Sequence, residues 1–342
     1  MDRLGIATAT VSLGKIEGGH KIESILEAAA RHKIRGIELV HEHLEELALR
    51  SFGSVDEQAV IRAARLVRDQ SDFLGLSVFA LQPFAFYDGL LDDEQHHRML
   101  DKMHHWVVLA QILGAEIIQM PSNFATTGTT GDMDKIVADL IEVADITGSV
   151  SPPIKIAYEA VAWGTHVDLW EQSWDIVKRV NRANFGLCLD TFHMAGRVYG
   201  DPTSASGKTP NADAEYKASL DLLRRELDPA KIFYLQLSDA ERLARPLIPG
   251  HELYIEGANQ RMTWSRGARL FPLEAVFGGY LPVLAAIATI VNDVGYRGWI
   301  SMEIFSKQLK KPNSPRVPDE YARRAAASYR RVYDALHWDG LI

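Results

Sequence analysis

A short apolar run, a polar loop and a stretch with helical spacing follow one another about eight times along this chain of 342 residues. Continuous runs of isoleucine, leucine and valine predict strands that are buried on both faces, and the helices between them predict that these strands are parallel. Such a series without a break in composition predicts a (β/α)8 TIM barrel, and we expect one domain over residues 1–342. A doubly wound open sheet is the alternative, but the chain lacks the glycine-rich phosphate turn that often follows an early strand of that fold.

The boundaries of these units follow from composition and spacing. The expected strands lie near 3–8, 36–40, 77–83, 116–122, 154–160, 185–190, 231–239 and 299–305. The expected helices lie near 21–32, 55–74, 92–113, 133–148, 168–182, 213–227, 281–294 and 319–336. Two connections, 191–212 and 238–280, are long loops that follow strands six and seven. We expect them to cover part of the mouth of the barrel; disorder or packing against another subunit are the alternatives.

The overall charge limits the partners of this chain. A formal net charge of −8 and a pI of about 5.9 give no general basic field, which argues against nucleic acid or an anionic membrane as the main partner. The sequence therefore indicates an acidic protein that acts on a small molecule. The one cysteine, Cys188, excludes an internal disulfide and a cysteine-based zinc cluster, and we expect it to be packed in the core.

Nothing in the composition predicts membrane insertion or secretion. No segment approaches the roughly 18 apolar residues that a membrane-spanning helix needs. The first residues, MDRLGIATATVSLG, carry charges where a secretory signal has an unbroken apolar core. We therefore expect a cytoplasmic protein, and the sequence leaves homo-oligomer formation open.

Polar side chains stand at the ends of the predicted strands five to eight, where an apolar core does not tolerate them without a partner. They are Glu159, Asp190, Gln236 and Glu303. The carboxyl ends of parallel strands meet at one face of a barrel, which is where such folds bind substrates. Three carboxylates that converge there would raise one another's pKa values unless a cation lay between them. A ligand set made only of oxygen favours Mg²⁺ or Mn²⁺ over zinc, although Co²⁺ could substitute.

His193 follows Asp190 by three residues, so it is expected near the same face. A histidine beside a carboxylate can act as a general base near neutral pH, and an outer hydrogen-bonding role is the alternative. Alternatively, each strand-end group could form its own salt bridge or face solvent, without a shared site. Other histidines lie on a polar expected helix and are interpreted as solvated or structural: His96, His97, His104 and His105.

Four segments are similar to segments of one enzyme family. They are LQPF (81–84), CLDTFHMAGRVYGDP (188–202), YLQLSDA (234–240) and MTWSRGARLFP (262–272). Through them the chain resembles, over nearly its whole length, the 3-dehydroshikimate dehydratases of the xylose isomerase-like TIM barrel superfamily, and most of all the single-domain members of fungal quinate catabolism. The resemblance implies a hydro-lyase that converts 3-dehydroshikimate to protocatechuate and water through a metal-stabilised enolate.

The resemblance also implies roles for individual residues. One divalent metal ion would be held by Glu159, Asp190, Gln236 and Glu303. Gln236 is the discriminating ligand, because many sugar isomerases and endonucleases of the superfamily have histidine at that strand end. His193 would be the catalytic residue, with Glu159 and Glu303 as further catalytic groups, and Ser265 and Arg269 would bind the substrate.

The residues of the early strands and loops are less defined by the resemblance. Arg266 and Arg245 are alternative partners for the substrate carboxylate, and Gln82 is a further substrate-binding candidate. Other candidates in this part of the chain are His41, Glu42, His43 and Tyr87. Some bacterial relatives carry a second, dioxygenase-like domain, which we do not expect here.

Three other functions remain as alternatives. A metal-dependent ketose isomerase or epimerase would use the same cation, with Glu159 and Glu303 as its two bases; the WSRGAR segment and His193 favour the dehydratase. An endonuclease for abasic DNA needs a basic groove and a histidine-rich site of several metals, and the net charge and Gln236 argue against both. A non-catalytic binding barrel would not need all four strand-end groups.

Overall fold

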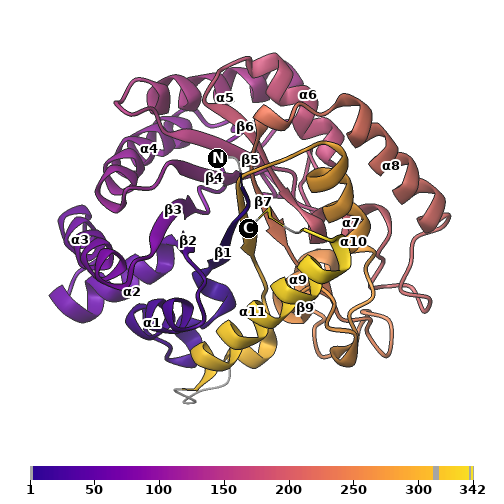
Figure 1. Cartoon of the computed structure of the whole chain (residues 1–342). Helices are drawn as coiled ribbons and strands as arrows, with labels where there is room; N and C mark the ends of the chain where they lie inside the picture. Colours follow the sequence, from indigo (N-terminus) through magenta and orange to yellow (C-terminus); the bar gives the residue numbers. More distant parts are fainter. Residues whose placement is uncertain (1–2, 311–315, 339, 342) are drawn as a thin grey trace.

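Eight parallel strands close into a barrel in the computed structural model, which describes residues 3–310, 316–338 and 340–341 (Figure 1). These strands are β1 (Gly5–Ala9), β2 (Gly36–Val40), β3 (Ser77–Gln82), β4 (Ile117–Pro121), β5 (Lys155–Glu159), β6 (Phe185–Asp190), β7 (Ile232–Leu237) and β10 (Trp299–Met302). Each pairs with its neighbours in chain order, and β1 pairs with both β2 and β10, which closes the ring. The predicted TIM barrel is confirmed.

Helices cover the outside of the barrel (Figure 1). Those that spacing predicted are α1 (Ile22–Arg31), α3 (Glu57–Leu74), α4 (Asp93–Leu113), α5 (Met133–Gly148), α6 (Trp170–Val180), α8 (Ala212–Glu226), α10 (Val283–Ala288) and α11 (Val317–Leu336). A π-helical turn over Thr289–Asp293 continues α10, so the helix expected at 281–294 is present in two parts. In the portion of the chain that the structure describes, no helix is both long and apolar enough to cross a membrane.

Among the described residues, three α-helices were not predicted: α2 (His41–Phe52), α7 (Thr191–Val198) and α9 (Gln260–Ala268). The helices α7 and α9 lie in the two long connections, and the second connection also contains an antiparallel ribbon of β8 (Asp239–Ala240) and β9 (Arg269–Leu270). A surface helix is identified from its sequence by one apolar face and one polar face. Most side chains in the second half of α9 are buried, so this helix does not show a continuous polar face. The connections are long, as predicted, but they carry regular structure.

The inside of the barrel is filled by aromatic side chains from three strands: Phe79, Tyr234 and Trp299. The ring of Phe79 stacks on Trp299 with 5.1 Å between the centroids and meets Tyr234 edge-on at 5.4 Å. The glycine of β2 makes room for them, because a Cβ at Gly36 would lie 2.6 Å from the Trp299 ring. Cys188 is a free, buried thiol in the same cluster, as predicted. These residues come early in their strands, so the apolar cluster lies below the carboxyl ends of the strands. The side chains at the carboxyl ends can therefore be polar.

The aromatic cluster gives a stability test. Replacing Phe79 with alanine should lower the free energy of unfolding by about 3–5 kcal/mol, because it removes a fully buried ring and leaves a cavity. Urea unfolding measures this change. Phe73 on α3 is 88% exposed, so Phe73→Ala is a matched control that should stay within about 0.5 kcal/mol of the wild type. Equal losses in the two variants would contradict the packing described.

Candidate active site at the mouth of the barrel

The strand-end groups that the sequence singles out come from neighbouring strands. Asp190 on β6 pairs in register with Gln236 on β7, which pairs in turn with Ser301 on β10. Glu159 ends β5, and Glu303 follows β10 directly. The three carboxyl side chains and the Gln236 amide belong to residues that are at most 5% exposed. The barrel therefore gathers three carboxyl groups and one amide at the carboxyl ends of its strands.

Arg269 lies among these carboxyl groups and supplies a positive charge. Its Nη1 donates to Asp190 Oδ2 at 2.5 Å and to Glu303 Oε2 at 3.1 Å. Its Nε donates at 2.8 Å to Oγ of Ser265, which lies four residues earlier. Ser265 lies on the last turn of α9 and Arg269 directly follows that helix, so the end of α9 brings both residues to the site.

Burial and mutual repulsion raise the pKa values of these carboxyl groups. Burial first, and then the charges of Asp190 and Glu303, raise the pKa of Glu159 well above its ordinary value. Burial raises the pKa of Glu303 to about 8, although the Arg269 charge acts in the opposite direction. Burial also raises the pKa of Asp190, again against the effect of Arg269. One guanidinium group therefore does not balance three buried carboxylates.

Two buried oxygen atoms of this group have no hydrogen-bond partner among the described residues. They are Oε1 of Glu159 and Oε1 of Gln236. A buried acceptor without a donor is costly unless another ligand satisfies it. Ligand atoms of Glu159, Asp190 and His193 also lie within 4.8 Å of one another. The excess of negative charge and the unpaired oxygens fit a divalent cation.

His193 reaches the site from the first turn of α7. Asp190 caps this helix, because its Oδ1 accepts the N–H of Phe192 at 2.7 Å, so α7 begins where β6 ends. As a result His193 Nε2 lies 3.7 Å from Asp190 Oδ2 and 3.8 Å from Glu159 Oε1. The ring of Trp163 packs against the imidazole with 4.8 Å between the centroids. Asp190 is thus the N-cap of α7, and His193, three residues later, lies in the first turn of that helix.

Both nitrogen atoms of the His193 ring face a donor. The backbone N–H of Ala162 donates to Nδ1 at 2.8 Å, and Nη2 of Arg269 lies 2.9 Å from Nε2. A neutral imidazole has one bare nitrogen, so these two contacts favour opposite tautomers. Burial, and then the charge of Arg269, lower the pKa of His193 well below its usual value, so the ring is neutral. Arg269 favours the tautomer whose bare nitrogen is Nε2.

A cavity of about 380 Å³ opens at the mouth of the barrel. The predicted residues that line it are Glu42, His43, Gln82, Glu159, His193, Ser265, Arg266, Arg269 and Glu303. Asp190 and Gln236 are almost fully buried and lie outside this lining. The structure therefore brings seven predicted residues to one cavity: Glu159, His193 and Glu303 as catalytic candidates, and Gln82, Ser265, Arg266 and Arg269 as substrate-binding candidates.

Some of the less defined candidates lie elsewhere. The hydroxyl of Tyr87 donates at 2.9 Å to the backbone oxygen of Asp139 on α5, and His41 stacks on Trp106 with 4.8 Å between the rings. Arg245 is exposed and does not line the cavity. Tyr87 and His41 are therefore packing residues, and Arg245 is not placed as a partner for a substrate in this cavity.

A second cluster of potential ligands consists of His96, Asp139 and Glu142. Nε2 of His96 lies 2.7 Å from Glu142 Oε2, and Nζ of Lys135 donates to Asp139 Oδ1 at 2.5 Å. Lys135 already provides the countercharge, and the cluster joins α4 to α5. The structural interpretation of His96 fits this arrangement.

Several residues in or beside the site were not predicted, and three of them are polar residues with close contacts there: Lys15, Glu38 and Gln119. Nε2 of Gln119 donates to Glu159 Oε2 at 2.6 Å. Lys15 is 7% exposed, lines the cavity, and has its Nζ 5.1 Å from the ring centre of Phe305. Glu38 and Gln119 are single polar residues inside the apolar runs GIELV and EIIQMPS, which is the signal that identified Gln236. Lys15 lies in the loop after β1, where composition gives no such signal.

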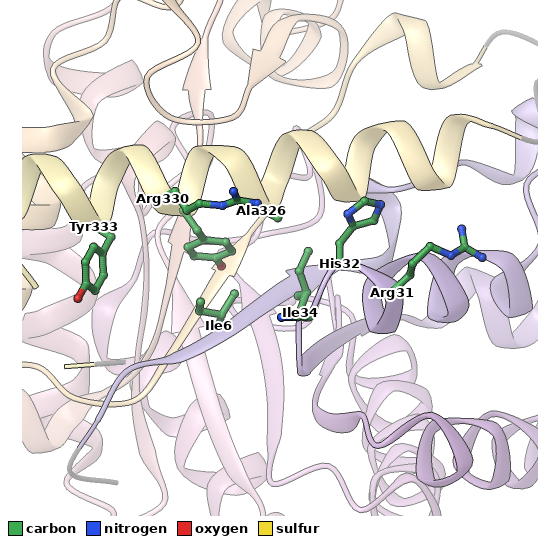
Figure 2. Close-up of a pocket in the computed structure, with 9 residues that line it drawn as sticks. Ile6, Arg31, His32, Ile34, Ala326, Arg330 and Tyr333 are labelled. Atoms are coloured by element: carbon green, nitrogen blue, oxygen red, sulfur yellow. The ribbon is translucent and has the colours of Figure 1, made fainter. Parts of the chain in front are cut away.

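A larger cavity, of about 630 Å³, lies between α11 and α1, beside the loop that leads into the amino end of β2 (Figure 2). Figure 2 shows Ala326, Arg330 and Tyr333 of α11 on one side of it and Arg31 of α1 on the other. Arg31 is paired with Asp319, at 2.6 Å. None of the predicted site residues lines this cavity, and in barrels of this kind the amino ends of the strands serve stability rather than chemistry.

Comparison with known proteins identifies the fold family. The family model described as a xylose isomerase-like TIM barrel matches residues 26–332. The chain belongs to the xylose isomerase-like TIM barrel family. Within it, the chain is 44% identical over 338 residues to the 3-dehydroshikimate dehydratase of Neurospora crassa, and the match covers 97% of this chain and 94% of that relative. The resemblance predicted from the sequence segments is confirmed.

Two other similar proteins are longer chains. The 3-dehydroshikimate dehydratase of Pseudomonas aeruginosa is 31% identical over 273 residues, which cover 78% of this chain and 36% of that one. The solved structure of a xylose isomerase-like TIM barrel/4-hydroxyphenylpyruvate dioxygenase fusion protein has a TM-score of 0.73 and 25% identity, with 98% of this chain and 44% of that chain covered. The likeness therefore extends over less than half of each longer relative.

The position of Arg269 gives a prediction about metal-free stability. At pH 8 with a chelator present, Arg269→Met should lower the free energy of unfolding by about 3–5 kcal/mol, because it removes the countercharge from buried carboxylates. Saturating Mn²⁺ should recover part of this loss. Urea unfolding with and without metal measures both changes. The neighbouring Arg266 is exposed, so Arg266→Met is the control, and a similar loss in this control would contradict the assignment.

Proposed function

We propose that this protein removes water from 3-dehydroshikimate to give protocatechuate and that it uses one divalent cation, Mg²⁺ or Mn²⁺. The observation that carries the proposal is the 44% identity to the N. crassa 3-dehydroshikimate dehydratase over nearly all of both chains. The cavity at the mouth of the barrel supports it with a proton-transfer residue, polar substrate contacts and a candidate cation site. Co²⁺ is a further cation that these ligands would accept.

The cation would be held by Glu159, Asp190, Gln236 and Glu303. This assignment is supported by their position on adjacent strands and by the unpaired oxygens of Glu159 and Gln236. A divalent cation at this place would polarise the substrate ketone and stabilise the negative charge that develops on its oxygen when a neighbouring proton leaves.

His193 is the residue that we propose to take this proton at Nε2. The carboxylate oxygens of Asp190 and Glu159 lie 3.7 and 3.8 Å from Nε2, so negative charge stands beside the proton that His193 takes. The same Nε2–H can then donate to the departing hydroxyl group. One proton and one hydroxide thus leave as water, and tautomerisation of the remaining ring gives the aromatic product.

Three side chains are arranged to bind the rest of the substrate. Oγ of Ser265 accepts from Arg269, so its own hydroxyl hydrogen is left to donate to a substrate carboxylate. Arg266 is exposed at the edge of the cavity, where its guanidinium can pair with the same carboxylate. The amide nitrogen of Gln82 donates to Glu38 and Glu303, which leaves the amide oxygen to accept from a substrate hydroxyl.

A direct assay tests the function. Purified protein, freed of metal with a chelator and supplied with Mn²⁺ or Mg²⁺, should convert 3-dehydroshikimate to a product with the ultraviolet band of protocatechuate. Glu303→Gln should abolish this turnover, because it removes one negative ligand of the cation. Glu274→Gln is the matched control, since Glu274 is 4% exposed, is bonded to Arg324 at 2.7 Å and does not line the cavity. Normal activity of a folded Glu303→Gln variant would contradict the metal assignment, and no product with any common divalent metal would contradict the function.

The proposed proton transfer gives a separate prediction. His193→Asn should lower kcat by about 10²–10⁴-fold, because it removes the group that carries the proton. The Mn²⁺ dissociation constant, measured by titration calorimetry, should change little, since His193 is not assigned as a ligand. A variant that loses Mn²⁺ binding and activity together would instead make His193 a metal ligand.

A further inference from the structure

Glu38 on β2 is a fully buried carboxylate that accepts hydrogen bonds from four side chains. Its Oε1 accepts from Tyr234 Oη and Gln236 Nε2, each at 2.7 Å, and from Gln82 Nε2 at 3.1 Å. Its Oε2 accepts from Ser301 Oγ at 2.6 Å. These donors come from β3, β7 and β10, so Glu38 connects strands around the barrel. With four donors on its two oxygens, Glu38 is not arranged as a metal ligand itself.

The bond from Gln236 to Glu38 determines which way the Gln236 amide points. Its Nε2 donates to Glu38, and its Oε1 is the buried oxygen without a partner among the residues that the structure describes. The reversed amide would place an oxygen 2.7 Å from a carboxylate oxygen, with no hydrogen between two acceptors. Glu38 therefore leaves the amide oxygen, the atom that a hard cation binds, for the candidate cation site.

The same carboxylate acts on Glu303 through Gln82. The amide nitrogen of Gln82 donates to Glu38 Oε1 at 3.1 Å and to Glu303 Oε1 at 2.7 Å, so both of its hydrogens are directed at carboxylates. The other oxygen of Glu303 faces Arg269 at 3.1 Å. Two of the four candidate ligands are thus oriented by one residue that does not bind the cation.

We propose that Glu38 is a positioning residue that orients Gln236 and Glu303 for one divalent cation. The inference rests on the metal site of the proposed function but not on the identity of the substrate. Some hydrogen bonds orient a metal ligand without contacting the metal. Removing such a bond typically weakens metal binding by about 10–100-fold. A residue that only stabilised the fold would change stability without this effect on affinity.

Metal affinity measured without substrate tests the proposal. In Glu38→Gln the dissociation constant for Mn²⁺, from titration calorimetry, should rise by about 10–100-fold. The melting temperature of the chelated protein is recorded in parallel, so that a loss of fold is seen separately. Glu274→Gln makes the same chemical change at a buried carboxylate outside the site and should leave the Mn²⁺ dissociation constant unchanged.

Exchanging the side chains of Glu38 and Gln236 distinguishes an orienting role of Glu38 from a role in fold stability alone. Gln236→Glu places a carboxylate against Glu38 and should weaken Mn²⁺ binding, although a carboxylate is the stronger ligand. The double variant Glu38→Gln/Gln236→Glu restores one donor and one acceptor and should bind Mn²⁺ more tightly than either single variant. If Glu38→Gln alone does not fold, the Mn²⁺ affinity of the double variant compared with that of Gln236→Glu still tests the role of Glu38.

The possible results separate the two proposals. Unchanged Mn²⁺ affinity in folded Glu38→Gln, or a double variant no tighter than Gln236→Glu, would overturn the role of Glu38 and leave the metal site standing. Absence of Mn²⁺ binding by the wild-type protein would overturn the metal site and the role of Glu38 together. Weaker binding in Glu38→Gln with recovery in the double variant supports the proposal, whatever the substrate is.

Discussion

Repulsion among three buried carboxylates at the mouth of the barrel is the constraint on which the rest of the site depends. Glu159 and Asp190 end the neighbouring strands β5 and β6, and Glu303 follows β10, which only β7 separates from β6, so the fold itself brings the three together. Arg269 provides one positive charge, and the amides of Gln82 and Gln119 donate to two of the carboxylates. These donors lower the cost of burial but leave negative charge and unpaired oxygens. A divalent cation is the partner that such a set of oxygens fits.

The barrel makes this arrangement through alternation along its strands. On β7, Tyr234 and Gln236 are two residues apart and share the inner face, one in the aromatic cluster and one at the site. The aromatic cluster fills the barrel below the carboxylates, and the cavity that they line opens at the mouth. Glu38 connects the two levels, because it bonds to both Tyr234 and Gln236. The stability of the interior and the geometry of the site therefore depend on the same hydrogen bonds.

The barrel and the strand-end groups could be predicted from the sequence because both leave local signals. Apolar runs that recur between helical stretches indicate parallel strands. A carboxylate buried at the end of such a run costs free energy unless a cation or a hydrogen-bond donor pairs with it. The partners of these groups could not be found this way. Arg269 bonds to a residue 79 positions away, and Glu38 to residues up to 263 positions away. The helices α7 and α9, which carry His193 and Ser265, have 8 and 9 residues and are largely buried, so neither shows the several turns of apolar and polar faces that mark a long surface helix.

Groups from four neighbouring strands are proposed to hold one divalent cation at the mouth of this barrel. Crystals grown with Mn²⁺ and measured near its absorption edge would locate this cation. We expect one anomalous peak within about 2.5 Å of oxygen atoms from Glu159, Asp190, Gln236 and Glu303. A peak coordinated by His193 in place of Gln236, or no peak among these residues at saturating Mn²⁺, would contradict this proposal.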